Sequence, residues 1–160
     1  MNRGRLASCR FLSLALFVPL AMVPLRAQQP RPLSAAAIPS DQLLRPAQLQ
    51  RELQSHHPPL ILQVGSRLLF DEAHISGAEY AGPASRPGGL ALLRNRVESL
   101  PRDRAIVLYC GCCPWDRCPN IGPAWRLLHH MGFTRLRILY IAQNFGADWA
   151  DRGFAVDKSQ

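Results

Sequence analysis

The stretch AIVLYCGCCPWDRCPN, residues 105–120, joins an apolar run to a loop that holds four cysteines within nine positions. The run at 105–109 is short and rich in β-branched residues, which predicts a buried strand. After the loop, residues 123–131 combine a proline suited to the first turn of a helix with apolar side chains at helical spacing. The segment therefore predicts a strand, a cysteine-rich loop and a helix in succession.

Strands and helices are also expected to alternate on both sides of this segment. The other expected strands lie at 60–64, 79–81 and 136–141, and the other expected helices at 46–54, 90–100 and 144–152, with a short helix within 66–74 and a turn at 83–89. Apolar strands that are bounded by Pro and Gly and separated by helices are typical of parallel sheets. The expected fold class is therefore α/β, with a small, mostly parallel sheet flanked by helices.

The N-terminal segment 1–27 has the pattern of a secretory signal peptide. It contains four arginines and no acidic residue, an apolar run at 11–23 and a small residue, Ala27, at its end. The apolar run is shorter than the roughly 20 residues that span a bilayer. We expect cleavage after Ala27, a linker at 28–39 and one domain at 40–160. The mature protein is then periplasmic or secreted, with no stable membrane association.

The basic composition does not by itself indicate nucleic-acid binding. The formal net charge is +8, but four of the 19 basic residues belong to the expected signal peptide. Hydrophobic residues make up 48% of the chain, which is enough for a core and excludes a disordered protein. We expect small-molecule partners and no nucleic acid; the oligomeric state stays open.

The expected chemistry centres on Cys110, the first residue after the strand at 105–109. In parallel sheets the working site lies at the carboxyl ends of the strands. Loop N–H groups and the helix beyond them stabilise a thiolate, which is the nucleophilic form, and can also hold an anion or a terminal sulfur atom. We therefore predict Cys110 as the catalytic residue. The predicted substrate-binding loop consists of Gly111, Cys112, Cys113, Pro114, Trp115, Asp116 and Arg117.

A disulfide in this loop is an open alternative. An exported protein meets oxidising conditions, so Cys118 can pair with Cys113 or Cys112 and leave Cys110 free. Cys113 and Cys118 are also candidates for a resolving role in thiol exchange. The sequence argues against a phosphatase, because the Cys-x5-Arg pattern requires an arginine where Asp116 stands.

Metal binding is the other alternative. Four thiolates suit soft Cu(I), and His129 and His130 follow on the next helix. Structural zinc usually takes paired cysteines from two separate segments, which this sequence lacks. We expect no metal and no organic cofactor.

Five segments in order resemble the rhodanese-like family. The resemblance is carried by the strand at 60–64, HISGA at 74–78, the strand with its cysteine at 106–110, GFT at 132–134 and the closing pattern at 148–153. It implies a small α/β sheet domain. In active members it also implies transfer of sulfane sulfur from a donor such as thiosulfate to a thiol or cyanide, through a persulfide on the cysteine that corresponds to Cys110.

Two departures distinguish this chain from the family. The Asp and Arg that usually flank the valine of the first strand are replaced by Gln63 and Gly65. The cysteine loop is longer and carries CGCCPW at 110–115, which indicates a separate subgroup. We expect a thiosulfate sulfurtransferase-like enzyme that uses a thiol acceptor. The alternative is a non-catalytic rhodanese-like module that uses the loop for redox chemistry or metal binding.

The remaining residues of interest have expected structural roles. We expect Trp125 and Trp149 to lie in the core and His74 to support a turn. Trp115 either lines the mouth of the pocket or packs onto the domain. Arg117 either pairs with Asp116 or attracts an anionic donor.

Overall fold

The sheet is built from parallel strands, as the sequence predicts. The computed structural model describes Met1 and residues 38–159, so the expected signal peptide lies outside the described residues. Five strands lie in the order β1-β6-β5-β2-β4, and each neighbouring pair is parallel. The strands are β1 (Leu43–Leu44), β2 (Leu60–Gln63), β4 (Glu79–Tyr80), β5 (Ile106–Tyr109) and β6 (Leu136–Leu139).

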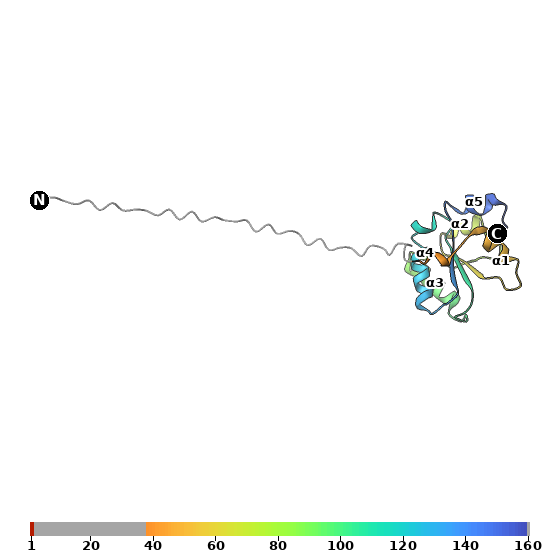
Figure 1. Cartoon of the computed structure of the whole chain (residues 1–160), viewed down its shortest axis with the longest axis horizontal. Coiled ribbons are helices and arrows are strands. Elements are labelled where there is room, and N and C mark those ends of the chain that lie inside the picture. Colours follow the sequence, from red (N-terminus) through yellow and green to blue (C-terminus); the bar gives the residue numbers. More distant parts are fainter. Residues whose placement is uncertain (2–37, 160) are drawn as a thin grey trace.

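Helices cover both faces of this sheet (Figure 1). On one face α3 (Pro87–Val97) and α4 (Ile121–His130) pack over side chains such as Leu62 and Leu108. On the other face α1 (Pro46–Leu53), α2 (Arg67–Glu72) and α5 (Phe145–Asp148) enclose a second cluster around Ile61 and Val107. Because both faces are buried, β2 and β5 are apolar at nearly every position.

The helix expected at 144–152 is interrupted. α5 ends at Asp148, and a single 3₁₀ turn, η4 (Ala150–Arg152), follows it. Trp149 between them is fully buried, and its indole N–H donates to the carbonyl of Ala155 at 3.0 Å. The backbone leaves the helical conformation at Trp149, and the indole then lies in the core with a hydrogen-bond partner.

The α3 helix begins inside the segment expected to be a turn. Pro87 occupies its first position, where a missing N–H costs nothing. Gly89 is required by close packing, because a Cβ there would lie 2.1 Å from the carbonyl oxygen of Pro83. The Pro/Gly composition of 83–89 therefore reflects a tight entry into a helix as well as a turn.

Several short elements carry no clear signal in the sequence. β1 adds an edge strand beside β6, and β3 (His74–Ile75) pairs with β7 (Val156–Asp157) in a separate antiparallel ladder. A 3₁₀ turn, η2 (Ser40–Gln42), precedes β1. Ile38, in the expected linker, is buried against the core.

Several boundaries differ from the prediction by one to three residues, and α3, expected at 90–100, ends at Val97. α4 begins at Ile121, two residues before the expected start, and β6 ends at Leu139, two residues before the expected end. Within residues 38–159, no helix has both the length and the apolar character needed to cross a bilayer.

Candidate active site

Cys110 lies at the carboxyl edge of the sheet, directly after the central strand β5. The register pairs Gln63 of β2 with Tyr109 of β5, and the N–H of Val64 donates to the carbonyl of Tyr109 at 2.9 Å. The segment after β2 therefore runs beside Cys110. Only 3% of the surface of Cys110 is exposed, so its position is determined by the core.

Gly65 and Gln63 support Cys110 from the neighbouring strand. A Cβ at Gly65 would lie 2.8 Å from the Cys110 Sγ, so the sulfur occupies the space that a side chain would need. The Gln63 amide N–H donates to the carbonyl of Cys110 at 3.1 Å, while its oxygen accepts from the N–H of Gly65 at 3.1 Å. The two residues that stand in place of the family's Asp and Arg, Gln63 and Gly65, are thus joined to each other and to Cys110.

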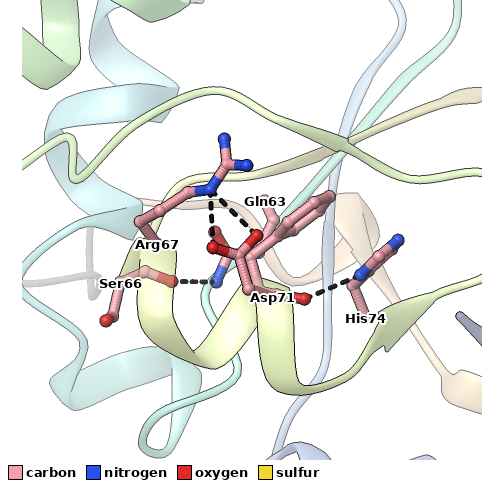
Figure 2. A network of polar contacts seen from close by, with 6 residues as sticks. Gln63, Ser66, Arg67, Asp71 and His74 are labelled. Carbon is pink, nitrogen blue, oxygen red and sulfur yellow. Dashed lines mark hydrogen bonds and ion pairs between the residues drawn. The ribbon is translucent and has the colours of Figure 1, made fainter. Parts of the chain in front are cut away.

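The start of α2 is joined to the same support (Figure 2). The amide of Gln63 also donates to the carbonyl of Ser66 at 3.4 Å, and Arg67 binds both carboxylate oxygens of Asp71 at 2.9 Å. At the end of α2, Nδ1 of His74 donates to the carbonyl of Phe70 at 2.7 Å. His74 therefore has a structural role, in agreement with the prediction.

Asn120 also contacts the sulfur of Cys110. Its amide N–H donates to the Cys110 Sγ at 3.3 Å, and its oxygen accepts from the backbone N–H of Ser85 at 2.9 Å. Asn120 is buried and directly precedes α4. It was not identified from the sequence, although an asparagine before a helix that follows a cysteine loop is a usable signal.

The four thiols of the loop form a contiguous cluster. The Sγ of Cys112 lies 3.2 Å from that of Cys110 and 3.2 Å from that of Cys113. The Sγ atoms of Cys110, Cys112 and Cys118 all lie within 4.8 Å of one another. All four are free thiols here, so the predicted pairings of Cys118 stay predictions.

This arrangement determines which residues can hold a metal. Three sulfur atoms at this separation suit a soft ion such as Cu(I). The histidines considered as further ligands lie at the end of α4, where the ring of His129 stacks on Trp125 at 4.8 Å. A metal site would therefore consist of thiolates.

The negative charge of the cluster is favoured on Cys118. A hydrogen bond from the Cys110 thiol, together with the backbone N–H groups of Asn120 and Ile121, stabilises the thiolate form of Cys118. These contacts lower the pKa of Cys118 to about 6, although burial acts to raise it. The pKa of Cys110 is raised by the same contact with Cys118 and by burial. The sequence predicts that the helix after the loop stabilises a thiolate at Cys110. In the structure, this effect applies to Cys118 instead.

A pocket of about 300 Å³ opens beside the cluster. Of the four thiols, Cys110 and Cys112 line it, together with Gly111 of the predicted loop. Its walls come from α2, β5 and α5, through side chains that include Leu69, Tyr109 and Phe145.

The rest of the predicted loop lies away from this pocket. Trp115, the first residue of the 3₁₀ turn η3 (Trp115–Arg117), packs near Tyr140 with ring centroids 6.3 Å apart. Its backbone N–H donates to the carbonyl of Ile141 at 2.9 Å, so it belongs to the packing of the domain. Asp116 and Arg117 are exposed. The structure therefore brings Cys110, Gly111 and Cys112 to the pocket and separates them from residues 114–117.

Comparison with solved structures identifies the fold. The rhodanese-like domain of the Alr3790 protein from Anabaena sp., solved in solution, is 22% identical, with a TM-score of 0.54 over 73% of this chain and 79% of that one. A crystal structure of the Alr3790 protein is 23% identical, with a TM-score of 0.56 over 72% of this chain and 92% of that one. A rhodanese-related protein from Thermoplasma volcanium is 15% identical, with a TM-score of 0.51 over 72% and 97%.

These likenesses show that the chain has the rhodanese-like fold, as its sequence resemblance implies. No protein-family model and no curated protein matches the chain. The fold alone does not assign a reaction, so function has to be argued from the site.

Proposed function

We propose that this protein is a sulfurtransferase in which Cys110 carries sulfane sulfur as a persulfide. The observation that carries the proposal is the position of Cys110: it directly follows the central strand β5, lines the pocket and receives a hydrogen bond from Asn120. A rigidly held nucleophile at the carboxyl edge of a parallel sheet, open to a pocket on one side, can react with a small donor.

The reaction has two steps. The Cys110 thiol loses its proton to solvent water, the resulting thiolate attacks the outer sulfur of a donor such as thiosulfate, and the bond between the two donor sulfurs breaks. Sulfite leaves with the bonding electrons, and Cys110 holds a persulfide. An acceptor thiolate then attacks the outer sulfur, so that the Cys110 thiolate is released and the acceptor becomes a persulfide. Gly111 and Cys112 are the loop residues that line the pocket beside Cys110.

Mass spectrometry of the reduced mature protein tests this proposal. Incubation with sulfane donors, thiosulfate and an organic thiosulfonate among them, should add one sulfur atom, which peptide mapping places on Cys110. Cys110→Ser should abolish the added sulfur. Cys118→Ser should retain measurable transfer, since Cys118 does not line the pocket. Persulfide formation at the wild-type rate in Cys110→Ser would assign the nucleophile to another cysteine.

A soft-metal module is the second candidate function. The mutual approach of the Cys110, Cys112 and Cys118 sulfur atoms within 4.8 Å supports it. Metal analysis of protein purified without oxygen distinguishes the two. Stoichiometric copper that blocks persulfide formation would favour the metal module, and metal-free protein that accepts sulfur would favour the transferase.

Export is part of the proposal. It is supported by the arginine-rich start, the apolar run at 11–23 and the small residue Ala27. The mature protein then acts in the periplasm or outside the cell, on small-molecule donors and thiol acceptors.

A further inference from the structure

The pocket beside Cys110 carries negative charge and no positive charge. Among the described residues that line it, Glu72 is the one with a charged side chain. Arg117, the arginine of the cysteine loop, is exposed and does not line the pocket. Arg67 on α2 is bound to both oxygens of Asp71, which compensates its charge. A dianion entering the pocket therefore meets a like charge without a cation to offset it.

Two backbone N–H groups of the α5 segment beside the pocket are already in hydrogen bonds. On the α5 side, the N–H of Phe145 donates to the carbonyl of Gly111 at 2.8 Å, and the N–H of Ala147 donates to the Asn144 side chain at 2.9 Å. These two groups cannot also bind an oxyanion, so the α5 side of the pocket offers few anion contacts.

The walls of the pocket are largely apolar. Leu69 is 38% exposed, and the rings of Tyr109 and Phe145 approach each other with centroids 6.0 Å apart. Ala73 completes an apolar surface beside the Cys110 sulfur. Covering this surface with a hydrocarbon group is favourable, whereas covering it with a strongly hydrated dianion costs hydration energy.

We propose that the pocket selects an organic sulfane-sulfur donor over inorganic thiosulfate. In such a donor, an apolar group is attached to the part of the molecule that leaves when the outer sulfur is transferred. The inference rests on the proposed sulfur transfer and adds the class of donor. For an organic thiosulfonate, the Cys110 sulfur attacks the outer sulfur, and its thiol proton passes to solvent water. The bond between the outer sulfur and the sulfonyl sulfur breaks, and the organic sulfinate leaves with the bonding electrons. The apolar group packs against Leu69 and Phe145.

Two donors with the same reacting sulfur atoms test the proposal. Benzenethiosulfonate carries one negative charge and an apolar ring, and thiosulfate carries two charges and no carbon. The rate of sulfur addition to reduced protein, followed by intact mass, should be about tenfold or more higher with benzenethiosulfonate, the scale expected for one apolar group in a pocket.

Paired variants assign the preference to the pocket. Leu69→Arg places a cation in the pocket wall and should raise the rate with thiosulfate relative to benzenethiosulfonate. Leu68→Arg is the matched control, since Leu68 is adjacent, 72% exposed and not a lining residue. Glu72→Gln should raise the thiosulfate rate by about fivefold at low salt, and less at high salt, because it removes a like charge. Asp103→Asn, at the opposite end of β5, should leave the rate unchanged.

The outcomes separate this inference from the proposed function. A thiosulfate rate equal to or above the benzenethiosulfonate rate in the wild type overturns the donor class and leaves sulfur transfer intact. Equal effects of Leu69→Arg and Leu68→Arg overturn the assignment of selectivity to the pocket. Absence of sulfur addition from either donor, with all four thiols reduced, overturns the sulfurtransferase itself.

Discussion

The Cα of Gly65 and the Sγ of Cys110 lie so close that no side chain fits between them. A Cβ at position 65 would come within 2.8 Å of the sulfur and 2.9 Å of the Cys110 carbonyl oxygen. Non-bonded carbon contacts have their optimum at about 3.5–4.0 Å, so a side chain there would displace the candidate nucleophile. The glycine thus determines the position of the sulfur as much as β5 does.

Gly65→Ala should destabilise the protein and disturb the site. We expect the free energy of unfolding to fall by about 1–3 kcal/mol, the usual cost of overpacking, and sulfur addition to Cys110 to slow. Gly88→Ala is the matched control, since a Cβ at Gly88 has open space around it. Alanine in α3 should stabilise by about 0.5–1 kcal/mol. Urea unfolding measures both, and equal stability of Gly65→Ala and the wild type would contradict the contact.

The thiolate of the cluster should titrate at Cys118. Ultraviolet absorbance of the reduced protein should show one thiolate that forms with a midpoint near pH 6, since the pKa of Cys118 is lowered to about 6. Cys118→Ser should lose this step. Cys112→Ser, which alters an exposed thiol of the same loop, should keep it. Persistence of the step in Cys118→Ser would place the charge on another sulfur.

The same pKa shift predicts how stability depends on pH. An unfolded cysteine titrates at about pH 8.5, and the pKa of folded Cys118 is lowered to about 6. The contribution of the thiolate is therefore complete above pH 8.5 and is lost as the pH falls towards 6. The difference in unfolding free energy between the wild type and Cys118→Ser should shrink over this range. A difference that grows as the pH falls would have the wrong sign.

Asn120→Asp should change the sulfur environment while keeping the contact with Ser85. The remaining oxygen can still accept from the Ser85 N–H, but the donor to the Cys110 Sγ becomes a carboxylate oxygen. We expect the thiolate midpoint to rise and the unfolding free energy to fall by about 1–3 kcal/mol. Asn95→Asp, on the exposed side of α3, is the control and should leave the midpoint unchanged. A midpoint that stays near pH 6 in Asn120→Asp would remove Asn120 from the site.

Export predicts a defined N-terminus. Amino-terminal sequencing of protein from the periplasmic or secreted fraction should begin at Gln28. An intact Met1 in that fraction would show that no signal peptide is removed. Replacing Leu14 and Leu16 in the apolar run with arginine should retain the precursor inside the cell.

The main architecture was predictable because it depends on strong local patterns. The apolar strands β2, β5 and β6 and the amphipathic helices α1 and α4 all bury a continuous face, and their spacing is visible directly in the sequence. The two-residue strands β1, β3 and β7 were not predictable, since they form only where a distant partner offers backbone groups.

The site was only partly predictable for the same reason. The position of Cys110 follows from the strand that it ends. The approach of Gly65, the hydrogen bond from Asn120 and the preference of the negative charge for Cys118 all arise from contacts between separate segments. The break at Trp149 likewise depends on tertiary packing of the indole, which outweighs local helix propensity.

The hydrogen bonds that Gln63 makes to the backbone of Cys110 and Gly65 do not depend on pH. Its neutral amide donates to the carbonyl of Cys110 and accepts from the N–H of Gly65 at the same time, which an ionised carboxylate, having no donor, cannot do. An aspartate or glutamate in this place would alter its hydrogen bonding on protonation. With glutamine at position 63, a change of pH changes the charge of the thiols but not the two hydrogen bonds of the amide. The thiols can therefore ionise while the backbone at Cys110 and Gly65 keeps its contacts.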